Sequence, residues 1–169
     1  MADLTSNERN ALAAIAKLED PVRLREMIKN ARRHNSAAVE AAAFERLCFV
    51  QPEATPGTVE HDVWQSIHAL EELLREERGR TVRLSRTRQK ISRDGEAKTV
   101  SDLTLKPSPS QGFHDLVERG LPELTFEAVV LRHPRTFDAE VQQAAIKRFK
   151  AAGLDPNHFT PDTQEPTHG

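Results

Sequence analysis

TVEHDVWQSIHALEELLREERGRTVRLSRTRQKISR, residues 58–93, joins the longest amphipathic pattern of the chain to its most basic segment. In the first half, apolar residues recur at steps of three or four, which is the spacing of one face of an α-helix. This apolar face consists of Val59, Val63, Ile67, Leu70 and Leu74. We therefore predict a helix over 58–78 at the centre of the fold, with the flanking Trp64 largely buried.

The second half, residues 78–93, carries seven basic residues and no acidic residue. We predict a helix over 81–93 that Leu84 and Ile91 hold against the core, because residues seven apart share one helix face. The basic side chains then project into solvent. The residues predicted to contact a partner are Arg80, Arg83, Arg86, Arg88, Lys90 and Arg93.

The composition favours an all-α fold. The chain of 169 residues is long enough for one domain with a core, and its hydrophobic and charged shares are 37% and 30%. Tyrosine is absent and only seven residues are glycine, whereas the frequent Ala, Leu, Glu and Arg lose little side-chain freedom in a helix. We predict a compact multi-helix bundle. The net charge of −2 conceals an asymmetry, since the other 17 basic residues face all 26 acidic residues.

The first fifty residues contain helix-start signals at the positions that a helical hairpin requires. Thr5 and Glu8 have the spacing of a capping box, and Asp20-Pro21 is a typical helix start. Residues 21–50 are typical of one unit of a helical-repeat protein, although no second copy is evident. A DNA-binding helix-turn-helix is the alternative, with its turn at 34–36. The helix after that turn is rich in alanine and poor in groups that read bases, so we favour a packing hairpin.

The second half of the chain contains a composition typical of a linker. Residues 106–110, KPSPS, predict a boundary between an N-terminal lobe over 1–105 and a C-terminal lobe over 111–155. Residues 156–169 are predicted to form a flexible tail. Residues 124–132, LTFEAVVLR, fit either a helix or a buried strand, and we interpret them as a helix because no partner strand is evident.

Two segments resemble those of small conserved bacterial proteins of unassigned function. The segments are RLSRTRQKI, residues 83–91, and GLPELTFEAVVLRHP, residues 120–134. The resemblance extends from about Glu19 to Asp155. It implies no activity, ligand or catalytic residue.

The basic helix leads to two hypotheses about function. In the first, a non-enzymatic protein with a regulatory role contacts nucleic-acid phosphates through a stripe of arginines, since arginine binds phosphate oxygens with two donors. In the second, the same face binds an acidic protein surface, either of a partner or of a second copy, as in an adaptor or self-associating scaffold. The acidic remainder and the lack of interleaved aromatic residues count against nucleic acid.

Other chemistry finds little support in the sequence. Cys48 is the single cysteine and lies among apolar residues, as a core thiol does. His61 and His68 are seven residues apart and lack the spacing of a helical zinc pair. His114-Asp115 and His133 beside Arg132 suggest a polar cleft that is not necessarily catalytic. We predict no cofactor, no metal site and no catalytic residue, and we lean against an enzyme.

The sequence also bears on location. It contains no apolar run long enough to cross a membrane, and MADLTSNERN lacks the pattern of a signal peptide. We therefore expect a cytoplasmic protein without membrane contact.

Overall fold

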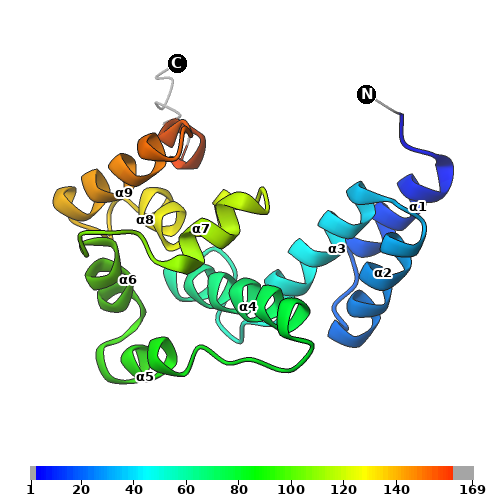
Figure 1. Ribbon diagram of the computed structural model, residues 1–169, viewed down its shortest axis with the longest axis horizontal. Helices are drawn as coiled ribbons and strands as arrows, with labels where there is room; N and C mark the ends of the chain where they lie inside the picture. Colours follow the sequence, from blue (N-terminus) through cyan, green and yellow to red (C-terminus); the bar gives the residue numbers. More distant parts are fainter. Residues whose placement is uncertain (1–2, 162–169) are drawn as a thin grey trace, which may run out of the picture. The chain divides into compact units, whose positions relative to one another are not determined.

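The structure is a computed structural model that describes residues 3–161 (Figure 1). Within these residues the regular elements are nine α-helices and two 3-10 helices, and there is no strand. The predicted all-α fold is confirmed. The elements are α1 Ser6–Ile15, α2 Pro21–Arg33, α3 Ala37–Val50, α4 Val59–Arg78, α5 Ser85–Asp94, α6 Glu96–Thr104, α7 Gln111–Glu118, η1 Pro122–Leu124, α8 Phe126–Arg132, α9 Ala139–Ala151 and η2 Pro156–Phe159.

The chain forms two compact units, residues 1–53 and 54–169. In the first unit, α1 and α2 both pack against α3. Leu24 and Ile28 on α2 and Phe44 and Leu47 on α3 are buried, so the apolar faces of the two helices form the core. The predicted helical hairpin is confirmed, and α1 is added to it.

The helices of the first unit begin where the capping signals predicted. The Thr5 hydroxyl accepts from the Glu8 backbone N–H, and the Glu8 carboxylate accepts from the Thr5 N–H at 2.8 Å. Asp20 caps α2 through the N–H of Val22. Ser36 precedes α3, but its side chain makes no cap hydrogen bond; its hydroxyl donates to Glu8 Oε1 at 2.7 Å. That bond ties α1 to the start of α3.

In the second unit, α4 and α8 supply the centre of the core. Val63 and Ile67 on α4 are fully buried, and α4 packs against α6, α7 and α8. Trp64 is only half-buried, although it packs against the core cluster. The predicted central helix is confirmed, while the expected burial of Trp64 is too strong.

The ambiguous segment 124–132 is helical, as predicted. It consists of the end of η1 followed by α8, which packs against α9, α6 and α4. Ala128, Val129, Val130 and Leu131 are all buried. Because α8 is covered on several sides, its apolar residues form a continuous run instead of a helical stripe, and this is why the sequence also fitted a buried strand.

The proline-rich segment 106–110 lies inside the second unit, and the unit boundary falls at Glu53 and Ala54 instead. Arg148 on α9 explains the difference. Its Nη2 donates to the carbonyl oxygens of Leu103, Lys106 and Ser108, at 3.2, 2.7 and 3.2 Å. These hydrogen bonds hold the irregular segment against α9, so its linker-like composition does not separate two lobes.

The first residues of the predicted tail are also ordered against the core. Residues 156–159 form η2, and the buried ring of Phe159 stacks on Phe149 with centroids 4.3 Å apart. Residues 162–169, the rest of the predicted tail, lie outside the described residues. In the described part of the chain, no helix has the length and apolarity needed to cross a bilayer.

Candidate functional site

The basic segment begins with an irregular stretch and continues as a short helix. Gly79 adopts a left-handed conformation with φ +68° and ends α4, and α5 begins only at Ser85. The predicted helix over 81–93 therefore starts four residues too early. The apolar Leu84 occupies the N-cap position of α5, and its side chain has no oxygen that could cap the helix. The backbone N–H of Leu84 donates to the Glu71 carboxylate on α4 at 3.0 Å.

The expected apolar contacts hold α5 in place. Ile91 is buried in the core cluster of the second unit, and Leu84 packs against that cluster from its edge. The two residues therefore orient the helix as predicted.

Arg88 points toward α4 and is paired there. Its guanidinium forms a two-pronged ion pair with the Glu71 carboxylate and lies over the Trp64 ring, 5.1 Å from the centroid. The Trp64 indole N–H in turn donates to Glu96 Oε1 at 3.1 Å. This arrangement uses the Arg88 side chain to attach α5 to α4.

Lys90 is also paired. Its ammonium donates to Asp94 at 2.9 Å and to Asp102 on α6 at 2.7 Å. The bonds to Asp102 and then Asp94 raise the pKa of Lys90, and the bonds from Lys90 and Arg93 lower the pKa of Asp94 to about 2. Lys90 therefore links α5 to α6.

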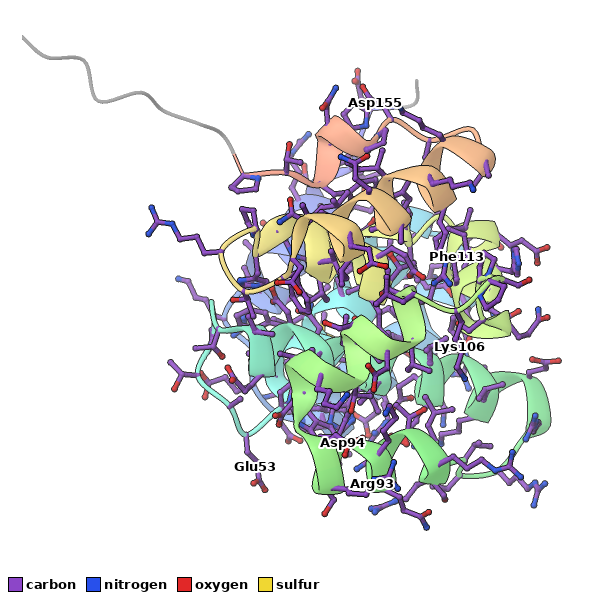
Figure 2. The ribbon with its side chains drawn as sticks, turned by 90° about the vertical axis from the view of Figure 1, so that its left-hand side faces the viewer. Glu53, Arg93, Asp94, Lys106, Phe113 and Asp155 are labelled. Carbon is purple, nitrogen blue, oxygen red and sulfur yellow. The ribbon has the colours of Figure 1, made fainter. Side chains whose placement is uncertain are left out.

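The remaining arginines face solvent. Arg80, Arg83 and Arg86 are exposed and make no hydrogen bond or ion pair with any described residue. Arg93 contacts Asp94 at 3.3 Å, but its side chain is 70% exposed; both residues are labelled in Figure 2. We call Arg80, Arg83, Arg86 and Arg93 the basic surface. It contains four of the six residues predicted to contact a partner.

The sequence did not predict which acidic residues pair with Arg88 and Lys90 and so separate them from the four exposed arginines. Glu71 has the spacing of a helical pair with Arg75, and nothing local predicts its bonds to Arg88, which lies 17 residues further along the chain and after a turn. Asp102 has the spacing of a helical pair with Lys98, and nothing local predicts its bond to Lys90. Only the packing of α4, α5 and α6 brings these carboxylates to the basic segment.

A second polar cluster joins the start of α4 to the end of α8. His133 Nε2 lies 2.6 Å from Asp62 Oδ2, and Arg132 Nε lies 3.3 Å from the same oxygen. Arg132 also donates to the carbonyl of Glu123 at 2.7 Å. The partner of Arg132 and His133 is thus Asp62, and not His114-Asp115 as the predicted polar cleft implied.

Histidine and cysteine contribute little further chemistry. Cys48 and His61 are buried, and His68 lies beside the Trp64 ring with centroids 6.4 Å apart. Nowhere between residues 3 and 161 do three His, Cys, Asp or Glu side chains come close enough to hold a metal ion.

Comparison of the chain with protein-family models, with curated proteins and with solved structures gave no match. The resemblance of residues 83–91 and 120–134 to small bacterial proteins stays a prediction. Any functional proposal therefore depends on the geometry of the chain itself.

Proposed function

We propose that this protein binds the phosphate backbone of a nucleic acid through the basic surface. Three exposed guanidinium groups support the proposal. They belong to Arg80, Arg83 and Arg86, and none of them pairs with a residue in the described range 3–161. Unpaired cations on one short segment attract a polyanion, because each phosphate contact releases condensed counterions.

The local geometry suits contacts to a backbone. Arg86 and Arg93 are seven residues apart on α5 and so share one face of that helix, and Arg83 lies just before its start. Each guanidinium presents several N–H donors in a plane, which matches a pair of phosphate oxygens. Such contacts position a protein on a nucleic acid without reading its sequence, so we propose binding with little sequence preference.

The two paired cations have a different role in the proposal. Arg88 and Lys90 are occupied by Glu71, Asp94 and Asp102. They hold α5 in the orientation that keeps Arg86 and Arg93 exposed, and they do not contact phosphate themselves.

A second function is self-association or docking on an acidic protein. A hollow of about 390 Å³ between α4 and α7 favours it, because its lining contains four acids and a single cation, Arg119, which pairs with Glu76 at 3.5 Å. The acids are Glu76, Glu77, Asp115 and Glu118. A second copy of the chain therefore carries carboxylates of the kind that the basic surface would bind.

The test compares wild type with R83E/R86E in gel-shift titrations of labelled single-stranded and duplex oligonucleotides at 50 and 200 mM salt. We expect R83E/R86E to weaken binding at least about tenfold, and wild-type binding to fall steeply with salt, because counterion release drives it. Circular dichroism should show an unchanged fold, since neither arginine pairs with another residue in the part of the chain that the structure describes.

R23E/K29E is the matched control. It makes the same change of net charge on exposed residues of α2, outside the basic surface. Equal weakening by both variants, or no binding by wild type at 50 mM salt, would contradict the proposal. Salt-dependent sedimentation of wild type without nucleic acid, abolished in R83E/R86E, would instead support self-association.

A further inference from the structure

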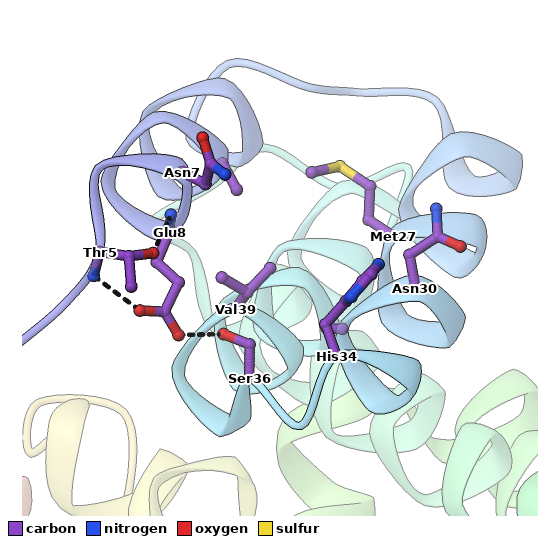
Figure 3. Close-up of a pocket in the computed structure, with 10 residues that line it drawn as sticks. Thr5, Asn7, Glu8, Met27, Asn30, His34, Ser36 and Val39 are labelled. Atoms are coloured by element: carbon purple, nitrogen blue, oxygen red, sulfur yellow. Dashed lines mark hydrogen bonds between the residues drawn. The ribbon is translucent and has the colours of Figure 1, made fainter. Parts of the chain in front are cut away.

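The first unit contains a groove between α1 and α2 with α3 as its floor (Figure 3). The hollow measures about 460 Å³, which lies within the usual range for small-molecule sites. Its apolar lining comes from Ala11, Met27, Ala31 and Val39. Its polar lining comes from Thr5, Asn7, Glu8, Asn30, His34 and Ser36.

Glu8 gives the groove its charge. It is the one carboxylate in the lining, and no Lys or Arg belongs to the lining within the described chain. The hydrogen bond from Ser36, followed by the one from the Thr5 backbone N–H, lowers the pKa of Glu8, so the carboxylate is ionised at neutral pH. The groove therefore presents a negative charge above an apolar floor.

The Glu8 carboxylate is held in one position and still has room to accept. Oε2 accepts from the Thr5 N–H and Oε1 accepts from the Ser36 hydroxyl, as the dashed lines in Figure 3 show. Each carboxylate oxygen offers about two lone-pair sites, so one site on each oxygen stays open. The side chains of Asn7 and Asn30 also line the groove, and each amide carries an acceptor oxygen as well as N–H donors.

We propose that this groove binds a primary aliphatic amine. The ammonium group would donate to the Glu8 carboxylate, and the methylene chain would lie on Met27 and Val39. An ammonium carries three N–H donors and no acceptor, which matches a site whose charge is a single carboxylate. An anion would meet the Glu8 charge without a compensating Lys or Arg.

A free alkylamine and the side chain of a lysine have this same chemistry. The inference goes beyond the proposed function, because every residue of the groove belongs to the first unit while the basic surface belongs to the second. Loss of nucleic-acid binding would leave it unaffected.

The experiment is an NMR titration of the full chain with pentylamine, with Nα-acetyl-lysine methylamide and with pentanol. We expect both amines to shift the signals of Glu8, Ser36 and the Met27 methyl group, and we expect pentanol to bind at least about tenfold more weakly, because it lacks a charge-assisted hydrogen bond. Binding of pentylamine alone would identify a free amine, and binding of the lysine derivative alone would identify a peptide side chain.

Two variants separate charge from shape. E8Q removes the charge but keeps a residue that suits the capping box, and it should weaken amine binding about tenfold or more. A11F fills the apolar side of the groove and should abolish binding while Glu8 is retained. E26Q is the matched control, because Glu26 is an exposed acid of α2 outside the groove.

Equal affinity of wild type and E8Q for pentylamine would overturn the proposal. Pentanol binding as tightly as pentylamine, or no shift at millimolar amine, would do the same. Circular dichroism of each variant shows whether a loss of binding reflects a loss of fold.

Discussion

Arg148 on α9 and Arg86 on α5 lie in the same unit and have opposite surroundings. The Arg148 side chain is 8% exposed, bonds Glu127 at 2.6 Å and donates to three backbone carbonyls. Arg86 is exposed and has no partner among the described residues. The same side chain is therefore part of the core in one place and available to a partner in the other.

Arg88 lies between these two extremes. Its side chain is 25% exposed and its partner Glu71 is 9% exposed, so the ion pair is partly buried and still in contact with solvent. The comparison therefore predicts a graded series, in which the cost of losing a charged group follows the burial of the pair.

The largest effect is expected for R148M. It leaves the Glu127 carboxylate buried without its cation and three carbonyls without a donor, so we expect a loss of about 3–5 kcal/mol in the free energy of unfolding. Urea denaturation followed by circular dichroism measures it.

The pH dependence sharpens this prediction. Burial raises the pKa of Glu127 against the lowering effect of Arg148, and removal of Arg148 takes away the largest of the effects that oppose burial. A carboxyl with a raised pKa in the folded state contributes stability at low pH that is lost as pH rises through that pKa. R148M should therefore be less impaired at pH 5 than at pH 8, and E127Q/R148M should recover part of the loss at pH 8. A loss of unfolding free energy below about 1 kcal/mol in R148M would contradict the prediction, because exposed ion pairs already contribute that much.

A smaller effect is expected for R88M. The methionine keeps an apolar contact with Trp64, but Glu71 loses two charge-assisted hydrogen bonds, so we expect a loss of about 1–2 kcal/mol after allowing for partial exposure. Because Trp64 is the single tryptophan, its fluorescence reports the same change. R86M is the control and should change stability by less than about 0.5 kcal/mol. Similar losses in the two variants would remove the distinction between inner and outer arginines.

The smallest effect is expected for D94N, and it should depend on pH. The pKa of Asp94 is lowered to about 2 by Lys90 and then Arg93, so its stabilising contribution is present above its ordinary value of 3.8 and is lost as pH falls from there towards 2. Thermal unfolding of wild type and D94N should therefore show a small constant difference from pH 7 to about 4 that shrinks below pH 4. A difference that stays constant down to pH 2 would contradict this assignment.

The sequence predicted those features that depend on residues close together in the chain. The capping box of Thr5 and Glu8, the start of α2 at Asp20-Pro21 and the end of α4 at Gly79 each require only neighbours within one turn. The exposure of Arg83 and Arg86 also followed from the local pattern.

Contacts between distant residues were beyond sequence reasoning. Ser36 directly precedes α3 and is of a residue type that often caps helices, yet its hydroxyl donates to Glu8, 28 residues earlier. The segment 106–110 was expected to separate two lobes, and Arg148 holds it from 40 residues away. Glu8 and Arg148 could not be identified as these partners from sequence spacing, because many other acidic or basic side chains of the chain could form the same hydrogen bonds.

The sequence by itself determined an all-α chain with a central amphipathic helix and a concentrated basic segment, because helix periodicity, capping and charge are local properties. Only the tertiary structure decided which cations of that segment are occupied, since Glu71 and Asp102 reach Arg88 and Lys90 through the packing of α4, α5 and α6. It likewise placed Glu8 over an apolar floor, because three helices must meet before a groove exists between them.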